Sequence, residues 1–268
     1  MSSRANLFQV VTFATDPRHG NPAFVLSGVR GIGDAALMAA CGILRTDVVA
    51  VIGDAADGAT PLRFFTSTGA HGGAGHATLA AAHIALHDVA LRGGSGAVRF
   101  HTASGDRAAQ FEGERIAIDF PAMPADRVER VSELEAALGA RPLESWVAPF
   151  GYVAVYEDPK VIAAMQPDLE RVAGFDRTAV IATAAGGGEA DIVIRVFAPN
   201  VGLPEDPVCG TAHRIIVPYW AARLGRKKIH SRQLSPRGGD LFCEDKGAVV
   251  AIGGDSSLVI EGTIRLPD

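Results

Sequence analysis

Residues 201–225 read VGLPEDPVCGTAHRIIVPYWAARLG, and this stretch gives the strongest indication of how the chain folds. Glu205 and Asp206 come directly before a proline, and Cys209 and Gly210 then begin a largely apolar run that predicts a buried helix. Acidic residues are favoured near a helix start because they lie at the positive end of the helix dipole. The same group of carboxylates and a thiol would also suit one wall of an active site.

A second stretch repeats this arrangement about half a chain earlier. RFFTS at 63–67 precedes GHATLAAAHIALHDV at 75–89, much as RVFAP at 195–199 precedes the run that begins at Gly210. An internal duplication would give each half a strand-rich wrap around one central helix, with both helix starts facing one cleft. Exposed N–H groups at helix starts bind anions, so such a cleft would hold a carboxylate or a developing enolate-like charge.

The composition is that of a soluble globular enzyme and argues against several other classes of protein. The 268 residues are 48% hydrophobic and 21% charged, and the formal net charge of -5 gives no reason to expect binding to nucleic acid or to a membrane surface. Three scattered cysteines, Cys41, Cys209 and Cys243, suit neither a disulfide framework nor a zinc site. The N-terminus lacks the apolar core of a signal peptide, and no apolar run is long enough for a membrane span. We therefore expect a cytoplasmic protein without a metal.

Hydrophobic alternation and turn residues predict the remaining elements. We expect strands within 6–15, 44–53, 61–68 and 190–200, two strands around a glycine turn within 106–124, and a closing hairpin within 248–266. Helices are expected at 75–89, at 132–139 with Ser132 as N-cap, and at 213–225. The proline-containing segment 121–124 marks a boundary between domains of residues 1–120 and 121–268, with a return of the last strand to the first domain left open.

Four motifs, in this order, resemble the PhzF-like (phenazine-biosynthesis) family of the diaminopimelate epimerase and proline racemase superfamily. They are TDPRHGNPAFVL (15–26), FFTSTGAHGGAGHATLAAAHIAL (64–86), FAPN with EDPVCGTAHRIIVPYWAARLG (197–200 and 205–225), and QLSPRGGDL (233–241). The resemblance implies an α/β (α+β) fold of two similar domains, each a β-barrel-like sheet around a central helix. It also implies a homodimer, a cofactor-free active site between the domains, and isomerases that move protons between carbons of small cyclic amino acids.

The resemblance assigns candidate roles residue by residue. His76 matches the family's active-site histidine and Asp206 its active-site aspartate. From the residues alone, His76 would equally cap a buried helix, and Asp206 would gain about 0.3–1 kcal/mol from the helix dipole. The candidate substrate contacts, which include backbone amides at the two glycines, are Asn21, Ser67, Gly75, Gly210 and Thr211.

The sequence departs from the family at its proton-shuttling glutamate. The Ser-Glu-Thr block that carries it aligns with Leu44-Arg45-Thr46, and a guanidinium cannot act as a base at neutral pH. Three replacements remain open: Asp47, if it shares a strand face with Arg45; Cys209, if the helix start favours its thiolate; and Asp206 acting with His76. Arg45 itself would clamp a substrate carboxylate or phosphate, or else lies on the surface.

Three functions fit these residues. The first is a cofactor-independent isomerase that shifts a proton and a double bond in a small carboxylated cyclic metabolite derived from an amino acid, in secondary metabolism such as antibiotic biosynthesis. The second is a racemase, epimerase or dehydratase that uses Cys209, although Ala74 stands where a second catalytic cysteine would be expected. The third is a catalytically altered protein that keeps the cleft for binding.

Overall fold

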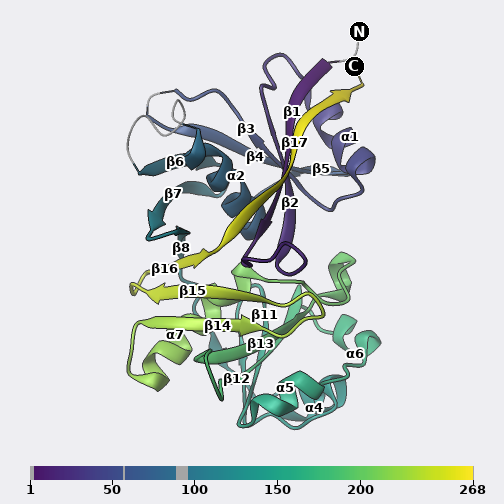
Figure 1. Cartoon of the computed structure of the whole chain (residues 1–268). Coiled ribbons are helices and arrows are strands. Elements are labelled where there is room, and N and C mark those ends of the chain that lie inside the picture. The colour runs from purple at the N-terminus through teal and green to yellow at the C-terminus, as the bar shows by residue number, and fades with distance from the viewer. Residues whose placement is uncertain (1–2, 57, 89–95, 268) are drawn as a thin grey trace. The chain divides into compact units, whose positions relative to one another are not determined.

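The computed structural model describes residues 3–56, 58–88 and 96–267 and divides the chain into two compact units (Figure 1). Unit 1 contains Met1–Asp119 and Gly253–Asp268, and unit 2 contains Phe120–Ile252. The last strand therefore belongs to unit 1, and the chain passes between the units once near residue 120 and once near residue 252. Within the described ranges, no helix is long and apolar enough to cross a membrane.

Unit 1 is a sheet wrapped around helix α2 (Gly75–His87), with helix α1 (Asp34–Leu44) outside. In α2, the residues from Ala77 to Ala82 are each at most 2% exposed, because the helix contacts strands on several sides and its small alanines let them approach. The buried helix predicted from this apolar run is confirmed to His87. Val89, the end of the prediction, lies outside the described residues. The strands are β1 (Ser3–Thr12), β2 (Asn21–Ser27), β3 (Val49–Ile52), β4 (Thr60–Thr66), β5 (Gly69–His71), β6 (Ala97–Thr102), β7 (Gly105–Glu112), β8 (Arg115–Pro121) and β17 (Ser256–Leu266).

Unit 2 is built on the same plan around helix α7 (Gly210–Leu224). Its other helices are α4 (Val131–Leu138), α5 (Pro159–Ala164), α6 (Leu169–Ala173) and the 3₁₀ helix η1 (Pro199–Val201). Its strands are β9 (Asp126–Arg127), β10 (Glu144–Val147), β11 (Gly151–Tyr156), β12 (Ala179–Ala185), β13 (Ile192–Phe197), β14 (Lys228–Gln233), β15 (Gly239–Asp245) and β16 (Val249–Gly254).

The strand pairings show that the two units are copies of one topology. In unit 1 the pairs β1–β2, β2–β3, β3–β4, β4–β6 and β6–β7 are alternately antiparallel and parallel. In unit 2 the pairs β10–β11, β11–β12, β12–β13, β13–β14 and β14–β15 follow the same alternation. The two motifs that suggested a duplication lie on the equivalent strands β4 and β13, and in each the arginine lies over the phenylalanine two residues later, Arg63 at 4.6 Å and Arg195 at 5.0 Å from the ring centroid. The predicted duplication is confirmed.

Three local predictions were wrong. Residues 44–53 do not form one strand, because the alanine-rich α1 continues to Leu44 and β3 begins only at Val49. Ser132 does not cap α4, which begins at Val131 after Arg130. Residues 248–266 do not form a hairpin, because only Asp255 separates β16 from β17, which is too short for a reversing turn, and β17 pairs with β1 instead.

The equivalent arginines of the two units have partners in different environments. Arg195 is bidentate to Glu205, with Nε–Oε1 at 2.7 Å and Nη2–Oε2 at 2.8 Å, and the two side chains are 10% and 14% exposed. Its Nη1 donates to the carbonyl of Met165 at 2.6 Å. Arg63 pairs with Asp34, but there the side chains are 49% and 58% exposed. Only the unit 2 pair is therefore withdrawn from water.

We expect Glu205→Ala to destabilise unit 2 by roughly 3–5 kcal/mol, because Arg195 would stay buried without its carboxylate. The matched change Asp34→Ala breaks an exposed pair and should cost less than about 1 kcal/mol. Urea unfolding followed by tryptophan fluorescence reports on unit 2, since both tryptophans of the chain, Trp146 and Trp220, lie there, and circular dichroism reports on both units. Equal small losses for the two variants would contradict the role given to the buried pair.

Candidate functional site

Buried hydrogen bonds hold the loop that leads into α7. The N–H of Asp206 donates to the carbonyl of Val196 on β13 at 2.9 Å. Gln233 of β14, 1% exposed, donates its Nε2 to the carbonyl of Asp206 at 2.6 Å and accepts the N–H of Cys209 at 2.8 Å. Because the Nε2 and Oε1 atoms of the Gln233 side chain bond to Asp206 and Cys209 respectively, these two residues are fixed relative to each other at the helix start.

Burial has the largest effect on the acidity of the Asp206 carboxyl group. Burial raises its pKa above the usual 3.8. Hydrogen bonds from the thiol of Cys209 and from the N–H of Val208 act in the opposite direction, and the neighbouring charge of Glu205 adds to the rise. A carboxylate with a raised pKa is a stronger base, which favours proton abstraction near neutral pH.

Cys209 is a buried thiol and not a favoured thiolate. The residue is 4% exposed and stands at the N-cap of α7. Burial raises the pKa of its thiol well above the usual value, and the carboxylate of Asp206 raises it further, while the N–H groups of Ala212 and Thr211 act against this. Desolvation and a negative neighbour thus act against the Cys209 thiolate that the helix start would favour.

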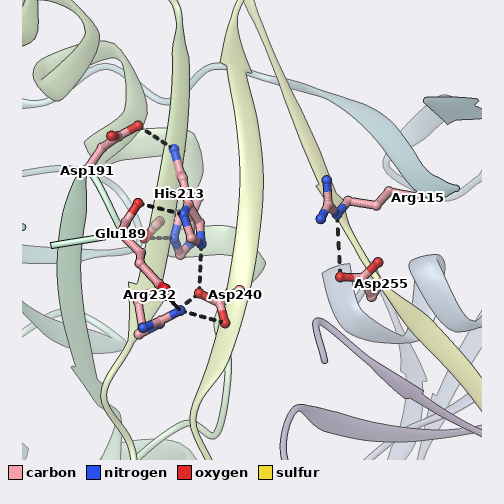
Figure 2. A network of polar contacts seen from close by, with 9 residues as sticks. Arg115, Glu189, Asp191, His213, Arg232, Asp240 and Asp255 are labelled. Atoms are coloured by element: carbon pink, nitrogen blue, oxygen red, sulfur yellow. Dashed lines mark hydrogen bonds and ion pairs between the residues drawn. The ribbon is translucent and has the colours of Figure 1, made fainter. Parts of the chain in front are cut away.

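His213 has a structural role in the first turns of α7. It is fully buried, with Nδ1 2.8 Å from the carbonyl of Cys209 and Nε2 2.8 Å from Oγ of Ser231. A carbonyl only accepts, so Nδ1 carries the proton and Nε2 accepts from the serine hydroxyl. Burial lowers its pKa to about 4, so this imidazole is neutral. Figure 2 also draws a polar network in which Nε of Arg232 donates to Oδ1 of Asp240 at 2.9 Å.

In unit 1, His76 is the second residue of α2 and is half-buried. Burial lowers its pKa from 6.5 to about 4, so the imidazole is neutral at neutral pH. The predicted helix starts at Gly75 and Gly210 are confirmed, and in both helices the N-cap residue gives no side-chain capping bond. Thr211 is half-buried in the first turn of α7.

The two other predicted substrate contacts of unit 1 lie on or beside strands. Asn21 begins β2 and is 7% exposed. It follows Gly20, whose φ is +73° and where a β-carbon would lie 2.3 Å from the carbonyl oxygen of Thr12, so only glycine fits this turn. Ser67 is exposed in the turn between β4 and β5.

Arg45 and Asp47 do not share a strand face, so the argument that placed Asp47 beside Arg45 on a strand was wrong. Both are exposed in the segment between α1 and β3. Arg45 adopts a φ of 51°, and the N–H of Thr46 returns to the carbonyl of Cys41 at 3.0 Å, a helix ending in which glycine is usual. Within the described ranges, neither charged group has a hydrogen-bonded or ion-paired partner.

Sequence reasoning gave no role to Gln233 and did not foresee the Arg195–Glu205 pair. Gln233 lies in the block QLSPRGGDL, which carried the family resemblance without a function for any of its residues. A signal was present in the alternation of β14, where Ile229, Ser231 and Gln233 occupy the buried positions. A glutamine on the buried face of a strand needs partners for its amide.

Comparison with known proteins finds similarity over nearly the whole chain. Residues 10–262 match the family model of phenazine biosynthesis-like proteins, PhzC-PhzF. Two proteins of Pseudomonas aeruginosa, both described as uncharacterized isomerases, are 38% and 36% identical over 97% and 96% of this chain and 98% and 97% of their own. A crystal structure of a PhzF-family phenazine biosynthesis protein from Enterococcus faecalis is similar with a TM-score of 0.89 at 32% identity, covering 98% of this chain and 99% of that one.

A more distant structure extends the likeness of fold. A hydroxyproline epimerase from Agrobacterium vitis, solved with bound trans-4-hydroxy-L-proline, has a TM-score of 0.60 at 13% identity, over 98% of this chain and 91% of that one. At this identity only the fold is shared. The two copies of a sheet around a central helix are thus the diaminopimelate epimerase-like fold predicted from the sequence.

We expect Cys209 to react slowly with iodoacetamide at pH 7, no faster than the other buried cysteines, Cys41 and Cys243, because its thiol is protonated. Asp206→Asn removes the carboxylate that raises the thiol pKa and should speed the labelling of Cys209 alone. Peptide mapping by mass spectrometry over a pH series measures both rates. Fast labelling of Cys209 in the unmodified protein at neutral pH would instead show a thiolate.

Proposed function

The chain belongs to the phenazine biosynthesis-like (PhzC-PhzF) family, and we propose that it is a cofactor-independent isomerase that shifts a proton, and with it a double bond, in a small carboxylated ring compound derived from an amino acid. Relatives over nearly its full length carry the name isomerase. The substrate class, a small carboxylated ring compound, is the one that the family resemblance implies.

The state of Asp206 is the observation that carries the proposal. Its carboxylate, with a pKa raised by burial, takes a proton from a carbon next to the substrate's carboxylate or double bond. The electron pair of the broken C–H bond moves along the conjugated system, and a proton is delivered to the carbon at its far end. N–H groups of Gly210 and Thr211 in the uncapped first turn of α7 would stabilise the negative charge that develops.

His76 is the proposed partner of Asp206 in moving the proton. Its pKa of about 4 keeps the imidazole neutral, so a ring nitrogen has a lone pair that can accept a proton, and the imidazolium so formed can then deliver that proton to carbon. Asp206 with His76 then replaces the family glutamate that Arg45 has displaced. Asp47, exposed on its loop, is the weaker candidate for the same role.

The other functions considered have less support. A racemase, epimerase or dehydratase acting through Cys209 needs a thiolate, which the raised pKa of that thiol disfavours. A protein that only binds its ligand would exchange no carbon-bound proton. The homodimer and the place in antibiotic or other secondary metabolism remain predictions from the family resemblance, and the cytoplasmic location remains a prediction from the composition.

In deuterated water, the enzyme should place deuterium on carbon in unsaturated proline-like or dihydroaromatic acids, followed by NMR and by the ultraviolet chromophore. Asp206→Asn and His76→Asn should each lower kcat by roughly 10²-fold or more, because a general acid–base group is lost. Asp47→Asn, the matched control, should leave exchange unchanged. If Asp47→Asn abolished exchange and Asp206→Asn did not, the base would be Asp47.

The pH profile gives an independent check of the base. A carboxylate base acts only when it is deprotonated, so kcat/KM should be retained above the pKa of Asp206 and lost as the pH falls through it. Since that pKa is raised, the loss should begin above the ordinary value of 3.8. The assignment would be contradicted if the kcat/KM of the wild type did not fall at low pH while that of Asp206→Asn did.

Arg45 is proposed to hold the substrate carboxylate. Arg45→Ala should weaken binding by roughly 1.5–3 kcal/mol through the loss of a charged hydrogen bond, and Arg45→Lys by less, because an ammonium keeps the charge but cannot reproduce the paired N–H geometry. Both variants keep a β-carbon at the positive φ of this position, so the backbone strain is unchanged. Calorimetry with the best substrate measures the affinities. Unchanged affinity in both would place Arg45 outside the site, whereas exchange gained by Arg45→Glu would mark it as the position of a lost base.

A further inference from the structure

A pocket of about 590 Å³ lies against α7, and every residue that lines it belongs to unit 2. Its volume falls in the range of small-molecule sites, about 300–1,000 Å³. The walls are mainly apolar and aromatic, with Trp146 of β10 and Tyr219 of α7 in edge-to-face contact at 5.7 Å between ring centroids. His76, Asp206 and Cys209 do not line it, so this pocket is separate from the candidate catalytic residues.

A proline inside α7 helps to build the wall of this pocket. Pro218 has no N–H, so the carbonyl of Arg214 one turn earlier lacks its helical donor. The N–H of Met123 donates to that carbonyl at 2.9 Å, and Nε of Arg214 donates to the carbonyl of Pro121 at 2.8 Å. Met123 and Pro218 both line the pocket, so its wall is fixed by hydrogen bonds before any ligand enters.

The two charged groups in the pocket are not equivalent. Glu144, whose side chain is 19% exposed, accepts three bonds, from Nη1 of Arg223 at 3.0 Å, the hydroxyl of Tyr219 at 3.3 Å and Nε1 of Trp146 at 3.2 Å. Arg223 is 50% exposed, and both of its hydrogen bonds are made by Nη1. Within the described residues its Nε and Nη2 groups have no hydrogen-bonded partner. The carboxylate is thus satisfied, and one edge of the guanidinium remains to bind a ligand.

We propose that this pocket binds a small organic anion with a flat apolar ring and one carboxylate. The ring packs against Trp146 and Tyr219, where aromatic surfaces gain contact area and favourable ring geometry. The carboxylate takes the Nε and Nη2 donors of Arg223 in the bidentate arrangement that guanidinium groups favour. A cationic ligand fits less well, because Glu144 already has three donors and Arg223 lies beside it.

The test uses naphthoate and its neutral amide, naphthamide, titrated into the full-length protein by calorimetry and by quenching of tryptophan fluorescence. Arg223→Gln should lower the affinity for naphthoate by roughly ten-fold or more and leave the affinity for naphthamide nearly unchanged, since only the charged contact is removed. Lys227→Gln, which removes the same charge from an exposed residue just after α7, should affect neither. Ala222→Phe, a substitution at an exposed lining residue, should block both compounds.

Two further results distinguish binding in this pocket from binding at another place on the protein. Asp206→Asn should bind naphthoate as the wild type does; loss of binding in that variant with retention in Arg223→Gln would place the compound at the candidate catalytic residues and overturn the proposal. Absence of saturable binding to the wild type would also overturn it. Dissociation of an oligomer by Ala222→Phe in sedimentation, with naphthoate affinity unchanged, would overturn it too and make the pocket face an interface with a second copy of the chain.

Discussion

Arg195 carries a fixed charge into the interior of unit 2, and the loop before α7 is shaped by the need to neutralise it. A buried guanidinium without a carboxylate would be strongly unfavourable, and Glu205, ten residues further along the chain, supplies that carboxylate. Asp206 is the next residue, and its N–H then meets the carbonyl of Val196, the residue after Arg195. Ser235 reinforces this loop by donating to the carbonyl of Pro207. In unit 1 the equivalent Arg63 is exposed, so only the copy that carries Asp206 has its loop held in this way.

Burial shifts the pKa values of four groups near the two helix starts toward their neutral forms. It raises the pKa of Asp206 and of Cys209, and it lowers the pKa of His76 and of His213 to about 4. A neutral environment of this kind suits a reaction in which the charge develops on the substrate, where backbone N–H groups can stabilise it.

The repeat could be predicted from the sequence because it is carried by local pattern: an arginine–aromatic strand, a loop, and a glycine that begins an apolar helix. The features that were missed depend on contacts distant in sequence or on the environment. Arg45 ends a helix in a backbone conformation that patterns associate with glycine, so the segment from Leu44 onward was read as one strand. The state of Cys209 follows from desolvation beside Asp206, which outweighs the helix-end rule. The partner of β17 is β1, more than two hundred residues away, and no local signal specifies it.

The two copies of the fold differ most in how they use the central helix. In α2 a run of small residues is enclosed by strands, and no proline interrupts it. In α7, Pro218 has no N–H to donate to the carbonyl of Arg214. The N–H of Met123, in the segment that follows β8, donates to that carbonyl instead. The carbonyl of Arg214, left without its helical donor, thus becomes a hydrogen-bond acceptor for the segment that precedes β9. That segment, β10 and the face of α7 around Tyr219 then enclose a cavity instead of packing tightly. The pocket therefore lies along the later turns of α7, whereas the residues proposed for catalysis in this unit precede its first turn.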